Sequence, residues 1–271
     1  MTLNIKALAD KFAQLSGEKK KTSYPTLPFW KPTLNEDGKP RSYNIRILPF
    51  DFSGQPFCEI GYYDNKKLNR FRLVAPVQFG MEDPIAEFVQ ELRKDRSNKG
   101  AWNTIKGLLP QSRFYAPILV REEKEKGVQI YEMSRNLCKK FYANFLDEEF
   151  ASEPLNDAMV GRDFKITVSP SGKTFTNEAT GKSYPVNDVE IRVATKSSKL
   201  LPTQEEVDKL LASAPKLMEY FRSQVKSADE LGKMLRNYLN IDAESVAGTP
   251  EMEEGADDAA LKSIEDQFDG L

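Results

Sequence analysis

Apolar and polar residues alternate along several short segments of the chain, the pattern of half-buried β-strands. In 69–74, for example, Phe71 and Leu73 fall on one predicted face, and Arg70 and Arg72 fall on the other. The other predicted strands are 43–48, 57–63, 113–120, 128–133, 164–168, 173–176 and 189–193. Their number and shortness favour an antiparallel sheet.

Helical spacing of apolar residues interrupts the strand pattern. The segment 84–94 begins with a proline, which suits a first helical turn, and 137–146 shows the same periodicity. After Pro202, Thr203 and Glu206 have the spacing of a capping box and open a helical region that reaches about residue 238. The sequence therefore predicts an α+β fold, with an antiparallel OB-fold-type β-barrel core and helical additions.

The pattern predicts three parts of the chain. Residues 1–23 are an N-terminal helical arm with a basic linker, 24–240 are the core domain, and 241–271 are a disordered acidic tail. The arm carries an apolar stripe at helical spacing, followed by three lysines: Leu3, Leu8, Phe12, Leu15, Lys19, Lys20 and Lys21. A helix this short needs a surface to dock on, which is either its own core or a neighbouring copy.

Charge is distributed unevenly. From Asp242 onward there are ten acidic residues against one basic residue, a net of -9, while the rest of the chain carries +7. A basic body with an acidic end suggests a polyanionic partner and a tail that competes with it, or a tail that only aids solubility. The tail ends in acids interspersed with apolar anchors for partner proteins: Ile264, Glu265, Asp266, Phe268, Asp269 and Leu271.

Composition narrows the possible chemistry. The chain contains no histidine, which removes imidazole ligands and the usual general base. Its two cysteines, Cys58 and Cys138, are far apart, so neither a disulfide framework nor a zinc site is expected. No apolar run is long enough to span a membrane, and no signal-peptide pattern occurs at the N-terminus.

Three short motifs resemble catalytic signatures without completing them. The run Ser171-Gly172-Lys173-Thr174 resembles the end of a P-loop, but its first glycine is replaced by Thr167, so we expect a hairpin turn. Glu122-Glu123-Lys124 is interpreted as a solvated turn, and Asp147-Glu148-Glu149 as an acidic helix end. No catalytic residue, metal ligand or cofactor is therefore predicted.

Cations interleaved with aromatic residues are the remaining signal. Single-strand binding needs cations along the phosphates and flat rings under the bases. The predicted phosphate contacts are Arg46, Lys66, Lys67, Arg70, Arg72, Arg113, Arg135, Lys139 and Lys140. The predicted stacking residues are Tyr62, Tyr63, Phe114, Tyr115 and Tyr131.

The order of these parts resembles the single-stranded DNA-binding, helix-destabilising proteins of T-even-like tailed phages. The segments 43–49, 113–120 and 264–271 carry the resemblance. It implies an OB-fold core with Arg46 and the Phe114-Tyr115 pair in the DNA cleft. It also implies cooperative, largely sequence-independent binding in DNA replication, recombination and repair, with other replication proteins as partners of the tail.

Two features depart from that family pattern. Better-known members hold a structural zinc with one His and three Cys, whereas 77–88 contains no such ligand, so we expect apolar burial to hold this region. The family's basic Ser/Thr motif lies close to its N-terminus, whereas the nearest match here, 19–23, follows the predicted helix.

The sequence therefore predicts a non-catalytic, cooperative single-stranded DNA-binding protein in the cytoplasm of an infected bacterial host, neither secreted nor membrane-bound. Two other classes stay open. A phage nuclease or other nucleic-acid-processing enzyme would require carboxylates converging on the basic residues. A structural or assembly protein would leave the basic and aromatic residues without a ligand.

Overall fold

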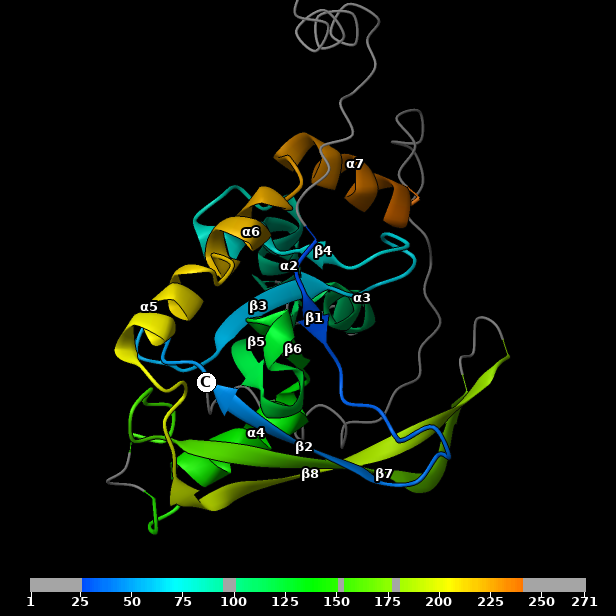
Figure 1. Cartoon of the computed structure of the whole chain (residues 1–271). Coiled ribbons are helices and arrows are strands. Elements are labelled where there is room, and N and C mark those ends of the chain that lie inside the picture. The colour runs from blue at the N-terminus through cyan, green and yellow to red at the C-terminus, as the bar shows by residue number, and fades with distance from the viewer. Residues whose placement is uncertain (1–25, 95–100, 151–153, 177–180, 241–271) are drawn as a thin grey trace, which may run out of the picture. The chain divides into compact units, whose positions relative to one another are not determined.

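The computed structural model describes residues 26–94, 101–150, 154–176 and 181–240 (Figure 1). Contacts divide the chain into two compact units. The first takes its described residues from Met1–Ile60 and Ser112–Gln224, and the second takes them from Gly61–Gln111 and Val225–Leu271. Each unit has a hydrophobic core of its own.

Six strands of one sheet pair in the order β1-β6-β5-β2-β7-β8. Their bounds are Phe29–Trp30 for β1, Arg41–Ile47 for β2, Gln111–Val120 for β5, Gln129–Met133 for β6, Arg162–Thr176 for β7 and Ser183–Ser197 for β8. β1 runs parallel to β6, and the other neighbouring strands in this order are antiparallel. Within the described ranges β1 does not pair with β8, so the sheet is open. The α+β class is confirmed, whereas the expected OB-type barrel is not.

Strand β3 (Cys58–Tyr63) carries the chain from the first unit into the second. It pairs with β5 and with the two-residue strand β4 (Leu73–Val74). The register places Tyr62 opposite Val74 and Tyr63 opposite Leu73. The strand expected over 69–74 is therefore limited to its last two residues, and the segment before it is a loop.

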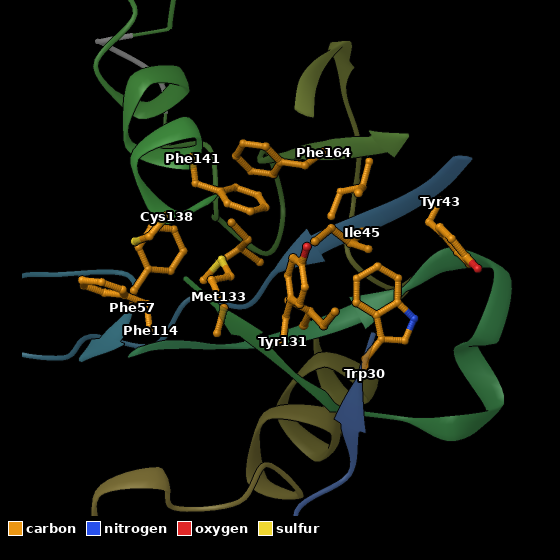
Figure 2. Packing of buried hydrophobic residues seen from close by; sticks show 14 of the residues in the cluster. Trp30, Tyr43, Ile45, Phe57, Phe114, Tyr131, Met133, Cys138, Phe141 and Phe164 are labelled. Atoms are coloured by element: carbon orange, nitrogen blue, oxygen red, sulfur yellow. The ribbon is translucent and has the colours of Figure 1, made fainter. Parts of the chain in front are cut away.

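The core of the first unit follows from strand alternation. Tyr43, Ile45 and Ile47 of β2 face it, and α4 (Arg135–Phe145) packs Cys138 and Phe141 onto it. Figure 2 shows Tyr43, Ile45, Cys138 and Phe141 among the other side chains of this core, several of which are aromatic. The Phe141 and Phe164 ring centroids are 5.3 Å apart, and those of Trp30 and Tyr131 are 4.9 Å apart.

The second unit packs helices around a smaller core. These helices are α2 (Pro84–Lys94), α3 (Ala101–Leu108) and α7 (Ala228–Tyr238), with the 3-10 helix η1 (Pro76–Phe79). Ile85 of α2, Ile105 of α3 and Leu231 of α7 are buried in the shared core. The Asp83 carboxylate caps α2 by accepting hydrogen bonds from the Ile85 and Ala86 backbone N–H groups, each at 3.2 Å.

Two short helices complete the described part of the first unit, α5 (Gln204–Ala212) and α6 (Leu217–Ser223), together with the 3-10 helix η2 (Arg121–Lys126). The capping box expected at Thr203 and Glu206 is confirmed at the start of α5. No helix in the described ranges is long and apolar enough to cross a bilayer.

Several expectations need correcting. The segments 164–168 and 173–176 belong to one strand, β7, and the run Ser171–Thr174 lies inside it. The expected hairpin turn there is wrong, because the pairing with β8 shifts register between Pro170 and Thr174 and then continues. Helix α3 was not anticipated. The arm at 1–23 and the tail at 241–271 lie outside the described residues, so the proposed domain boundaries stay a prediction.

Candidate nucleic-acid interface

Arg46 is a buried structural cation. Its side chain has no solvent exposure, and its guanidinium donates to Asp163 Oδ1 at 2.9 Å and to the Asp157 carbonyl at 3.0 Å. It also donates to the Ser198 carbonyl and hydroxyl, at 2.9 and 2.8 Å. Burial lowers the pKa of Arg46 below its ordinary value, and the Asp163 carboxylate opposes that shift. The expected phosphate contact at Arg46 is therefore corrected, because these bonds hold its donors inside the first unit.

Arg121 shares the carboxylate of Asp163. Its Nε donates to Asp163 Oδ2 at 3.0 Å and its NH2 donates to Oδ1 at 2.9 Å. The same guanidinium donates to the Lys199 and Leu200 carbonyls. Arg46 and Arg121 thus fasten the segment that follows β8 to the sheet. Because both oxygens of Asp163 accept hydrogen bonds, the cluster is stable in place and does not present a free cation.

The aromatic residues chosen as stacking candidates are core residues in this structure. Their relative exposures are 2–9% for Tyr62, Tyr63, Phe114, Tyr115 and Tyr131. Figure 2 shows Phe114 and Tyr131 among the other rings of the core. The expectation that these five rings stack on bases is corrected, because all five side chains are buried.

Contacts of three of these rings describe their surroundings. The Tyr115 ring lies on the face of β5 opposite to that of Phe114. Its centroid is 4.6 Å from that of Phe221 in α6. In the second unit, the Tyr63 hydroxyl donates to Asp83 Oδ2 at 2.7 Å, and burial raises the pKa of this tyrosine. The Tyr131 hydroxyl is buried with no hydrogen-bond partner among the described atoms.

The expected cations on α4 and β5 are accessible to different degrees. Arg135 and Lys139 are exposed on α4, whereas Lys140 Nζ donates to the Val189 carbonyl at 2.6 Å. Arg113 on β5 is half-buried, and its Nε lies 4.0 Å from Glu132 Oε1. These four residues stay candidate phosphate contacts.

Within the described ranges, exposed cations and an exposed ring come together in the loop 64–72 of the second unit, here called the basic-aromatic loop. Lys66, Lys67, Arg70 and Arg72 are all exposed, and the loop has one acidic residue, Asp64. Phe71 lies between the arginines and is 69% exposed. The Arg70 guanidinium carbon is 5.4 Å from the centroid of the Phe71 ring, a cation–π distance.

The basic-aromatic loop is ordered by its own contacts. Asn65 Nδ2 donates to the Gly107 carbonyl at 2.9 Å, and Asn69 Nδ2 donates to the Phe71 carbonyl at 2.9 Å. Leu68 is 6% exposed and inserts into the core of the second unit. The loop is thus anchored at three positions while Phe71 and the cations face solvent. The alternation in 69–74 predicted an inward Phe71, and that prediction is wrong because the β4 pairing begins only at Leu73.

Other exposed rings went unnoticed in the sequence. Phe175 and Tyr184, on β7 and β8, are 61% and 48% exposed, and Phe29 on β1 is 48% exposed. The signal that was available is clearest at Phe175, where the alternate positions on either side are the polar residues Lys173 and Asn177.

The remaining carboxylates and the predicted metal-free region have structural roles. Glu122 accepts hydrogen bonds from the Asn44 backbone and side chain, and Glu123 pairs with Lys126 at 2.9 Å. In the region 77–88, Ile85 is fully buried and Phe88 packs against the core of the second unit. Among the described residues, no group of three or more His, Cys, Asp or Glu side chains is arranged to hold a metal ion.

Together, the open sheet, the carboxylates engaged in structural contacts and the exposed cations define a candidate nucleic-acid-binding protein. A family model described as "gp32 DNA binding protein like" matches residues 40–239, most of the chain. The chain therefore belongs to the gp32-like DNA-binding protein family, which is a family of DNA-binding proteins and not of enzymes. A comparison with curated proteins found no match.

Proposed function

We propose that this protein binds single-stranded DNA with little sequence preference. The observation that carries the proposal is the basic-aromatic loop, in which Phe71 is 69% exposed beside Arg70. An exposed apolar ring costs free energy in water, and a base stacked on it would remove part of that exposed surface. The flanking lysines and arginines are suited to the phosphates on either side of the stacked base.

The same contacts explain a preference for single strands over duplex. A base can stack on Phe71 only when it is not already stacked and paired within a double helix. Every base has a flat face, so stacking discriminates little between sequences, and phosphate contacts carry no base information. The protein would therefore bind unpaired stretches and destabilise neighbouring duplex.

The experiment compares Phe71→Ala with the unchanged protein in an anisotropy titration of fluorescent oligo-dT. We expect Phe71→Ala to weaken binding about fivefold or more, because one stacked base contributes ~1–3 kcal/mol. The matched control is Val77→Ala, which removes an exposed apolar side chain, 54% exposed, from the same unit. The control should bind like the unchanged protein.

The salt dependence of the same titration tests the cations. The slope of log affinity against log salt on single strands is about -0.7 per phosphate neutralised, so substitution of Lys66 by Gln should make the slope shallower by about that amount. An affinity that does not change with salt concentration and is high for one sequence only would contradict the proposal.

Cooperative coating of long strands belongs to the same proposal, in DNA replication, recombination and repair within the cytoplasm of an infected bacterial cell. We assign self-association to the arm, through Leu3, Leu8, Phe12, Leu15 and the lysines at 19–21. We assign capture of partner proteins to the tail, through its apolar and acidic end at 264–271.

Two deletions test these assignments. Removal of residues 1–23 should abolish cooperative filling of poly-dT, seen as a loss of clustered binding by electron microscopy, while a short oligonucleotide is still bound. Removal of residues 241–271 should strengthen binding at low salt, because the tail carries a net charge of -9 against +7 for the rest of the chain, and screening is then weakest. Continuous filaments formed without residues 1–23 would contradict the assignment of self-association to the arm. Unchanged affinity without residues 241–271 would contradict competition between the tail and DNA.

A further inference from the structure

The base of the basic-aromatic loop has little regular strand pairing. The chain leaves β3 after Tyr63 and enters β4 at Leu73, and the register between the two strands consists of two residue pairs. Beside these pairs, the Ala75 N–H donates to the Gly61 carbonyl at 2.9 Å. So short a strand pair contributes little stability on its own, so other contacts are needed to hold the base of the loop.

The side chain of Gln78, in η1, bridges the two sides of this base. Its Oε1 accepts a hydrogen bond from the Gly61 N–H at 3.0 Å. Its Nε2 donates to the Ala75 carbonyl at 2.9 Å and to the Gly61 carbonyl at 3.3 Å. One amide therefore joins the strand that leads into the loop to the segment that leads out of it.

The Asp83 carboxylate holds the last residue of β3. Its Oδ2 accepts the hydrogen bond from the Tyr63 hydroxyl at 2.7 Å, while its Oδ1 accepts the two capping bonds at the start of α2. Both side chains are buried, so water does not compete for this bond. Burial raises the pKa of Tyr63, and the nearby Asp83 carboxylate raises it further, so the hydroxyl stays protonated and remains the donor.

A structural zinc does not fit the region that these bonds occupy. The segment 77–88 supplies no thiolate or imidazole, the usual zinc ligands. Both carboxylate oxygens of Asp83 and the Oε1 atom of Gln78 already accept hydrogen bonds. The sequence predicted that apolar burial holds this region, and hydrogen bonds from these two side chains hold it as well.

Gln78 and Asp83 have the same effect on the loop, because each fixes its base from an element outside it. A loop with a fixed base loses less conformational entropy when it binds a ligand, which strengthens binding without any direct contact. Neither side chain is suited to contact DNA itself. Asp83 is buried and acidic, and the amide of Gln78 is engaged on both sides.

We infer that Gln78 and Asp83 are positioning residues for DNA binding. They hold the base of the basic-aromatic loop so that Phe71 and the loop cations are presented together. The inference rests on the proposed function, because it takes the loop to be a contact for single-stranded DNA.

The test uses two variants of the full chain. Gln78→Met keeps the length of the side chain without its hydrogen bonds, and Tyr63→Phe removes only the hydroxyl that Asp83 holds. The matched control is Gln90→Ala, which changes an exposed glutamine on α2 of the same unit. Affinity for fluorescent oligo-dT should fall about threefold or more in both variants and stay unchanged in the control.

Two further measurements show whether these residues act through the loop. In the DNA-free protein, the Leu68 and Asn69 amides donate to the Asn65 carbonyl, and their hydrogen exchange should be faster in both variants than in the control. In the Phe71→Ala background, Gln78→Met should weaken binding by a smaller factor than it does in the unchanged protein, because the ring that it positions is gone.

Several outcomes would overturn the inference. Unchanged affinity in both variants, with or without faster exchange, would mean that the base of the loop does not control binding. An equal loss of affinity with and without the Phe71 ring would mean that Gln78 acts elsewhere. Melting curves show whether each variant is folded, and if Gln78→Met is not, Tyr63→Phe decides. If the variants bind normally while Phe71→Ala binds weakly, only this inference fails. If the unchanged protein does not bind oligo-dT, the proposed function fails as well.

Discussion

Two segments with similar sequence patterns differ in how far their aromatic rings are exposed to solvent. Arg113-Phe114-Tyr115 on β5 and Arg70-Phe71-Arg72 in the basic-aromatic loop both place cations next to aromatic residues. In the first, Phe114 is 9% exposed and Tyr115 is 2% exposed. In the second, Phe71 is 69% exposed. The adjacency of a cation and a ring therefore does not indicate which rings reach a ligand.

The cause of the difference is what covers each segment. β5 lies inside the sheet between β6 and β2, so alternate residues face two covered sides: Phe114 meets the core and Tyr115 meets Phe221 of α6. The segment around Phe71 precedes the β4 pairing and follows the anchor at Leu68, so no strand or helix of the described part of the chain buries its ring. A ring becomes available for binding where regular pairing stops.

The largest expected effect concerns stability. Phe114→Ala should lower the free energy of unfolding by about 3–5 kcal/mol, because it opens a cavity in a packed core. Phe71→Ala should change it by less than about 0.5 kcal/mol, because Phe71 is a surface residue. Urea denaturation followed by circular dichroism measures both. Similar losses of unfolding free energy in the two variants would contradict the conclusion that Phe114 is a core residue and Phe71 a surface residue.

A smaller effect is expected at the buried cation. Arg46→Ala should cost about 2–3 kcal/mol of stability, since charge-assisted hydrogen bonds to Asp163 and Ser198 are lost while Arg121 still pairs with the carboxylate. Affinity of the folded protein for oligo-dT should stay within twofold of the unchanged protein. Lys94→Ala, an exposed cation paired with Glu91, is the control and should alter neither quantity measurably. A large affinity loss in folded Arg46→Ala would restore its expected role in the cleft.

Much of the regular structure was predictable because burial follows periodicity. The alternation of Tyr43, Ile45 and Ile47 predicted β2, and the helix expected over 84–94 is α2 with the same bounds. The capping box at Thr203 fixed the start of α5, because it is a purely local interaction. Elements that are stabilised by contacts between residues close in the sequence are the ones that the sequence predicts reliably.

The candidate site was predictable only in part, because exposure depends on residues distant in the sequence. Nothing near Arg46 indicates that Asp163 and Ser198, more than 100 residues later, occupy its donors. Closure of the sheet likewise depends on whether its outer strands meet, which no single strand encodes. Lys66 and Lys67 are exposed, as a phosphate contact requires, because no long-range partner among the described residues overrides their local preference for water.

The register shift in β7 limits how the two-stranded ribbon formed by β7 and β8 can change length. Between Pro170 and Thr174 β7 has three residues where β8 has one, Val186, so β7 carries two extra residues. Two is a whole period of strand alternation, so Phe175 keeps the side that Lys165 has. Insertions or deletions of two residues at Gly172, whose φ of 71° suits a glycine, would keep the Phe175 ring on the same face as the Tyr184 ring opposite it. A change of one residue would turn Phe175 to the opposite side, so natural length variants of this ribbon should differ by even numbers.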